Sequence, residues 1–146
     1  MMKKRTLVLA ILCVICTSFL LKPALAMEGI AERIDYEDGS YAIVERVAST
    51  ESRSTTTNSK RYTYYNPYGE KCFQYILYAT FYYDGQTSRA RSCSGKAVLA
   101  AGWSVDSHDE YTSGDTAYGE AVFSGPNGEE RSVELFLTCD EDGNVS

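Results

Sequence analysis

Ser107, His108 and Asp109 are consecutive residues of the three types that hydrolases use as nucleophile, base and orienting acid. In such enzymes the three groups come from separate segments of a rigid scaffold, and neighbours on one strand or loop do not point at a common atom. A Gly-x-Ser-x-Gly turn that would present a serine nucleophile is also missing from the sequence. Cys72 with His108 as its base is a second pairing, but no helix is expected beside Cys72 to lower its pKa. We therefore predict no catalytic residue and interpret His108 as a solvated loop residue.

Metal chemistry is also not predicted. No two cysteines of residues 27–146 are close in sequence and His108 is the only histidine, which disfavours a zinc site. The segment Asp140–Asn144 resembles the start of a calcium loop, but its glycine is fourth, whereas the EF-hand pattern has glycine sixth. We predict no metal and no cofactor.

Three cysteines follow residue 26, namely Cys72, Cys93 and Cys139. An odd number in an exported protein implies one disulfide plus a free thiol or a bond to another chain. If Asp84-Gly85 closes a two-residue hairpin, Cys72 and Cys93 lie about 13 Å apart, which is beyond disulfide reach. We therefore predict a Cys93–Cys139 disulfide, which requires a bulge near Cys93 or a strand that ends before it, and a free or dimer-forming Cys72.

Tyrosines are the chemically distinctive surplus of this chain. All twelve lie after residue 26, and four of them gather around one turn: Tyr62, Tyr64, Tyr65 and Tyr68. Tyrosine gives a large contact area with a polar end, which suits recognition of an extracellular protein or a saccharide. The alternative is that tyrosines fill strands, where they are favoured. If Tyr64 and Tyr65 alternate inward and outward, half of the cluster belongs to the core.

The first 26 residues predict an export signal. Lys3, Lys4 and Arg5 precede an apolar run, and Ala24-Leu25-Ala26 has the small-x-small pattern of a cleavage site. Cleavage would leave 10 basic and 20 acidic residues from Met27 onward, a net charge of −10. This charge argues against nucleic acid and against an anionic membrane surface as partners. We predict a secreted protein with no membrane contact after cleavage.

The remaining chain predicts an all-β domain. We divide it into a polar segment, 27–60, with one strand (41–47) and a Ser/Thr-rich loop (48–60), and a sandwich core with a short acidic tail, 61–146. In the stretch Cys72–Tyr83 every odd-numbered residue is apolar or aromatic, which is typical of a half-buried strand. Asp106–Asp115 is polar and turn-like. About seven short strands favour a small antiparallel β-sandwich, with a small β-barrel as the alternative.

Several landmarks spread over 64–146 can be compared with known proteins. They are Tyr64-Tyr65-Asn66 with Gly69, Phe81-x-Tyr83-Asp84-Gly85, Cys93, Trp103-x-Val105, and Thr138-Cys139-Asp140 with Gly143-Asn144. This set resembles a group of small, exported, β-rich proteins of Gram-positive anaerobic bacteria that have no established function. The group has two cysteines, which match Cys93 and Cys139, and Cys72 departs from that pattern. The resemblance implies a fold and no chemistry.

Taken together, the residues favour a non-catalytic interaction or ligand-binding module, with Tyr62, Tyr64, Tyr65 and Tyr68 as its binding residues. The alternative is a secreted, bacteriocin-like antagonistic protein, although the lack of cationic charge counts against it. We do not predict an enzyme, since no nucleophile, base and orienting group form a recognisable set.

Overall fold

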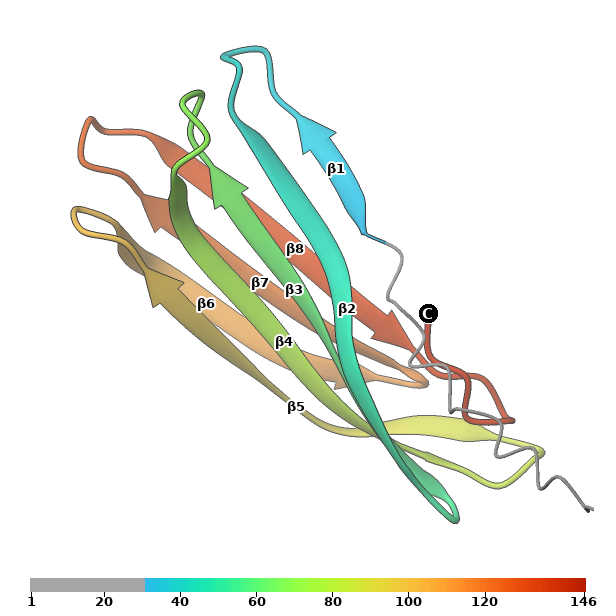
Figure 1. Ribbon diagram of the computed structural model, residues 1–146. Coiled ribbons are helices and arrows are strands. Elements are labelled where there is room, and N and C mark those ends of the chain that lie inside the picture. The colour runs from blue at the N-terminus through green and yellow to red at the C-terminus, as the bar shows by residue number, and fades with distance from the viewer. Residues whose placement is uncertain (1–30) are drawn as a thin grey trace, which may run out of the picture.

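The computed structural model describes residues 31–146 and contains two antiparallel sheets. One sheet has the order β1-β2-β3-β4-β5 and the other the order β6-β7-β8, and they lie as two layers (Figure 1). The strands are β1 (Glu32–Asp35), β2 (Tyr41–Ser52), β3 (Thr55–Tyr65), β4 (Lys71–Tyr83), β5 (Ser88–Leu99), β6 (Ser104–Ser113), β7 (Thr116–Ser124) and β8 (Glu130–Thr138). The predicted antiparallel β-sandwich is confirmed, with eight strands in place of about seven, and the barrel alternative is wrong because the sheets do not close.

The core lies between the sheets and follows the predicted period of two. On β4 the odd-numbered residues from Phe73 to Phe81 are all buried. They face the inward residues of β7 and β8, among which are Phe123 and Leu137. The rings of Phe73 and Phe123 stack with centroids 4.0 Å apart. Burial of this apolar surface is the main favourable contribution to folding.

The Ser/Thr-rich stretch 48–60 is not a loop, which corrects the prediction. β2 continues to Ser52 and β3 begins at Thr55, so the two form one long hairpin. Threonine is β-branched and favours strands even where little apolar surface is buried. Thr56 and Asn58 are buried, and the Asn58 side-chain amide donates to the Thr56 hydroxyl at 3.0 Å. One sheet, with the order β1 to β5, spans the predicted boundary between 60 and 61.

The polar stretch Asp106–Asp115 is also largely a strand and not a turn. It forms most of β6, which pairs with β7 from Ser104↔Ser124 to Ser113↔Thr116. β6 is an edge strand whose inward positions include His108 and Glu110, so it lacks the apolar alternation that marks a core strand.

The β4–β5 hairpin is longer than predicted. Tyr83 pairs with Ser88, which leaves a four-residue connection in which the Asp84 carboxylate accepts two backbone N–H groups. Farther along the hairpin the register shifts between Thr80 and Phe81, and Cys93 comes to lie opposite Ala79 on the core side. The bulge that the sequence required near Cys93 is thus confirmed.

The acidic tail, 140–146, folds back along β8. Val145 is buried and forms a bridge with Cys139. Ser146 and Thr138 exchange two backbone hydrogen bonds of 2.9 and 3.1 Å. None of the described residues forms a helix that could cross a membrane. The predicted export signal, 1–26, lies outside the described residues.

Candidate functional site

The four tyrosines predicted to bind a ligand do not form one surface. Tyr62 and Tyr64 are 4% and 3% exposed and belong to the core. Tyr65 points to the other side of β3 and stacks on Tyr41, with ring centroids 4.8 Å apart and an interplanar angle of 11°. Tyr68 lies in the β3–β4 turn and is 88% exposed. Strand alternation therefore divides the cluster, as the alternative interpretation expected.

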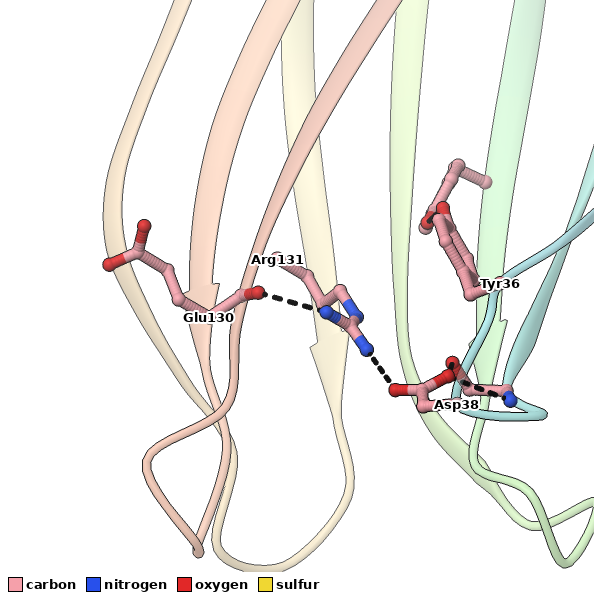
Figure 2. A network of polar contacts seen from close by, with 6 residues as sticks. Tyr36, Asp38, Glu130 and Arg131 are labelled. Atoms are coloured by element: carbon pink, nitrogen blue, oxygen red, sulfur yellow. Dashed lines mark hydrogen bonds and ion pairs between the residues drawn. The ribbon is translucent and has the colours of Figure 1, made fainter.

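Arg131, at the start of β8, crosses to the other sheet, where it meets Asp38 (Figure 2) and the ring of one of the two buried tyrosines, Tyr64. Its guanidinium carbon lies 5.2 Å from the ring centroids of both Tyr36 and Tyr64. Its Nη2 donates to Asp38 Oδ2 at 2.5 Å, across the gap between the sheets. Within residues 31–146 its Nε is buried without a hydrogen-bond partner. This arginine connects the two layers.

Asp38 is held in place by its own turn as well as by Arg131. Its carboxylate accepts hydrogen bonds from the Ser40 hydroxyl and from the Ser40 backbone N–H. These bonds and the nearby guanidinium lower the pKa of Asp38 below its ordinary value. The network is a structural link between the β1–β2 turn and β8.

A second polar cluster lies at the opposite side of the sandwich, between β4 and β6. The Tyr75 hydroxyl donates to Glu110 Oε1 at 2.6 Å, and His108 Nδ1 lies 3.1 Å from the same oxygen. A Cβ atom at Gly119 would lie 2.7 Å from the Tyr75 hydroxyl, and one at Gly95 would lie 1.9 Å from Glu110 Oε1. The two glycines therefore provide the space for this pair. His108 is exposed, as predicted, but it lies on a strand and its partner is a carboxylate.

Buried tyrosines and cysteines predict a loss of stability at alkaline pH. Burial raises the pKa of Tyr62 and Tyr75 well above the ordinary tyrosine value, and it raises the pKa of Cys139 to about 11. Since the folded protein holds these protons more tightly than the unfolded chain, their stabilising contribution is complete below pH ~9 and is lost as the pH rises above it. We expect the melting temperature to fall steadily between pH ~9 and ~11, and to fall less steeply in Tyr62→Phe. A melting temperature independent of pH over this range would contradict these burial assignments.

The predicted Cys93–Cys139 disulfide is not present, and all three described cysteines are free thiols. Cys93 Sγ lies 3.9 Å from the carbonyl oxygen of Tyr118, which pairs with Phe136. The Cys139 thiol lies 3.4 Å from the carbonyl oxygen of Asp140. The bulge brings Cys93 to the core side, but the two thiols contact different backbone carbonyl groups and are not bonded to each other.

Cys72 is 6% exposed and packs with the core beside Phe73. Its thiol lies 3.5 Å from the carbonyl oxygen of Glu70. Burial, followed by the charges of Glu129 and Glu70, raises the pKa of this thiol. The structure therefore does not present Cys72 at the surface, where a disulfide to another chain would form.

The outer face of the three-stranded sheet carries two rows of side chains, one acidic and one aromatic, that run across the strands. The first row consists of register partners on β6, β7 and β8, namely Asp109, Glu120 and Glu134. The second row lies two residues away on each strand and consists of Tyr111, Tyr118 and Phe136. All six point away from the core, since their strand neighbours Ala117, Ala121, Val133, Leu135 and Leu137 are buried. We call this surface the acidic–aromatic face and define it by these six residues.

The aromatic row is partly organised by its own contacts. Tyr111 and Tyr118 stack with centroids 4.9 Å apart, and the Tyr111 hydroxyl donates to Glu120 Oε1 at 3.2 Å. Tyr111 is 42% exposed and Phe136 is 50% exposed. Large exposed aromatic side chains in a row are typical of contact surfaces.

A shallow depression of about 410 Å³ lies over the carboxylate row. Its outward-facing lining residues are Ser107, Asp109, Glu120, Val122, Ser132 and Glu134. The depression is open, so it suits a ligand that lies across the strands and not a small molecule enclosed by the protein. In the described part of the chain, no three His, Cys, Asp or Glu side chains are placed to hold a metal ion.

Charge is divided unevenly between the two sheets. Residues 31–99, which include β1 to β5, carry nine basic and eight acidic residues. Residues 100–146, which include β6 to β8, carry one basic residue, Arg131, and eleven acidic ones. The negative charge is therefore concentrated on the part of the chain that forms the three-stranded sheet and the tail.

Comparisons with protein-family models, with curated proteins and with solved structures gave no match. The resemblance described from the landmark residues stays a prediction. The acidic–aromatic face was not found from the sequence, because it depends on the pairing of β6, which was interpreted as a turn. The alternation of Glu134 and Phe136 with Val133 and Leu135 was a usable signal, since it marks the two outward positions of a strand.

Proposed function

We propose that this chain is an exported, non-catalytic binding module and that the acidic–aromatic face is its recognition surface. The observation that carries the proposal is the pair of adjacent rows on an uncovered sheet face, one of aromatic rings and one of carboxylates. Aromatic rings supply contact area and the carboxylates supply directional acceptors, so that together they provide affinity and orientation. Export is supported by the leader-like residues 1–26.

A binding role is favoured over catalysis by the contacts of the reactive side chains. His108 contacts the carboxylate of Glu110, and the thiol of Cys93 lies against a backbone carbonyl oxygen. Neither arrangement pairs a nucleophile with a base, which catalysis by covalent attack requires. Tyr65 and Tyr68 are the remaining part of the predicted site, and Tyr68 is altered together with Tyr78 as the control in the test.

The test compares two double variants on a glycan array and on an array of synthetic peptides. Tyr111→Ala with Phe136→Ala removes the outer rings of the acidic–aromatic face, and Tyr68→Ala with Tyr78→Ala removes exposed rings from the other sheet. For every feature that the unaltered protein binds, we expect the first variant to weaken binding by about tenfold or more and the second to leave it unchanged. If the second variant weakened binding and the first did not, the binding site would lie on the five-stranded sheet. If the folded protein bound no feature on either array, the proposed function would be wrong.

A further inference from the structure

Strand β8 is an edge strand, and the backbone N–H and C=O groups that it directs away from β7 can be identified. It pairs with β7 on one side only. Thr138 directs both its N–H and its C=O away from β7, because both bond to Ser146. β8 pairs with β7 without a register shift, so every second residue has the same orientation, including Phe136, Glu134 and Ser132. In the described part of the chain, Ser132 and Glu134 have no partner strand on this side, and both side chains are exposed.

The chain itself already places two groups on this edge. The tail pairs with β8 at Thr138, in the antiparallel direction. Lys60, which points inward from β3, reaches Phe136, where its Nζ donates to the carbonyl oxygen at 3.3 Å. The same ammonium lies 4.7 Å from the centroid of the Phe136 ring. The edge therefore accepts an extended backbone at one point and a lysine ammonium at the next.

Glu134 is the next residue of β8 after Phe136 that directs its backbone groups away from β7. Its register partner on β7 is Glu120. Neither carboxylate has an ion-pair partner among residues 31–146, and the only basic residue of residues 100–146 is occupied by Asp38. A strand added to β8 would place every second side chain on the outer face, within reach of these carboxylates. The complementary side chains are lysine and arginine.

We propose that the β8 edge binds an extended, lysine- or arginine-containing segment of another protein, which adds to the three-stranded sheet as a fourth strand. Its backbone pairs with Ser132 and Glu134, and its basic side chains contact Glu134 and Glu120 beside the aromatic row. This mode of recognition combines main-chain hydrogen bonds for affinity with alternate side chains for specificity. The inference rests on the proposed function and adds to it the class of partner.

A peptide of alternating lysine and threonine, labelled with a fluorophore, is a suitable probe in an anisotropy titration. A second peptide has the same sequence with alternate backbone nitrogens methylated, which removes strand hydrogen bonds and keeps the charge. We expect the methylated peptide to bind about tenfold more weakly than the unmodified one. Ser132→Pro, which removes an outward N–H that β7 does not use, should weaken binding of the unmodified peptide to a similar degree.

Charge is tested by Glu120→Gln with Glu134→Gln, and the matched control is Glu37→Gln with Glu51→Gln, which removes the same charge from the other sheet. The first pair should weaken peptide binding about tenfold, and the control should change it less than about twofold. Equal effects of both pairs, or equal binding of the methylated peptide, would overturn the proposal, because the peptide would then be held by net charge alone. If saccharides bind to the acidic–aromatic face and the lysine peptide does not, the class of partner is wrong and the proposed function stands.

Discussion

Replacing Phe73 by alanine is expected to lower the free energy of unfolding by about 3–5 kcal/mol. Phe73 is 1% exposed and lies at the centre of an aromatic cluster. Its ring stacks on Phe123 at 4.0 Å and contacts Tyr64 at 5.2 Å and Trp103 at 5.1 Å between centroids. Removal of the ring leaves a cavity bounded by both sheets, which the rigid strands cannot fill by moving. Urea unfolding followed by Trp103 fluorescence measures the change.

The matched control for this prediction is Phe136→Ala, which removes the same side chain from an exposed position. Phe136 is 50% exposed, so the variant should lose less than about 1 kcal/mol. The slope of the urea transition should be unchanged in both variants, because the folded surface stays the same. Similar losses for the two variants would contradict the assignment of Phe73 to the core and of Phe136 to the outer face.

Replacing Gly119 by alanine is expected to cost about 1–3 kcal/mol, although alanine carries no strain in a strand. The added Cβ would lie 2.7 Å from the Tyr75 hydroxyl and 3.0 Å from Leu77 Cδ1. Both neighbours are buried, and the hydroxyl is held by its hydrogen bond to Glu110. The sheets must therefore separate locally or the Tyr75 ring must move away from Glu110.

A double-mutant cycle with Tyr75→Phe shows whether the hydroxyl causes this cost. Tyr75→Phe alone should lose about 1–2 kcal/mol, because Glu110 then loses the hydrogen bond from the tyrosine hydroxyl. In this background Gly119→Ala should cost about 1 kcal/mol less than in the unaltered protein, since the nearest atom is gone. Additive effects in thermal or urea unfolding would show that the two residues do not meet across the sheets.

The apolar strands could be predicted from the sequence because burial alone decides them. Phe73 to Phe81 on β4 show strict alternation, and no other arrangement removes all of these side chains from water. The strands that were missed, from 48 to 60 and from 106 to 113, have polar inward positions. Thr56 and Asn58 are buried and joined by one hydrogen bond within β3, and their burial follows from the packing of the sheets, which no local apolar pattern records.

The candidate site could be predicted only in part, for a related reason. The alternation of side chains along β3 predicted that half of the tyrosine cluster belongs to the core, and Tyr62 and Tyr64 are buried there. The contact between Arg131 and Tyr64 joins residues 67 positions apart, and no pattern in the sequence indicates that they meet. The rows of the acidic–aromatic face likewise form only when β6, β7 and β8 take their registers, because each row contains one residue from each strand.

The uneven division of charge between the sheets makes the folded protein an electric dipole, with its negative pole at β6 to β8. Near a basic partner, the field exerts a torque that turns the acidic–aromatic face toward that partner and the five-stranded sheet away from it. This orientation arises before any contact and fades with salt, since the Debye length is about 10 Å at 0.1 M. Copies of the protein that approach such a partner would therefore meet it with the same side.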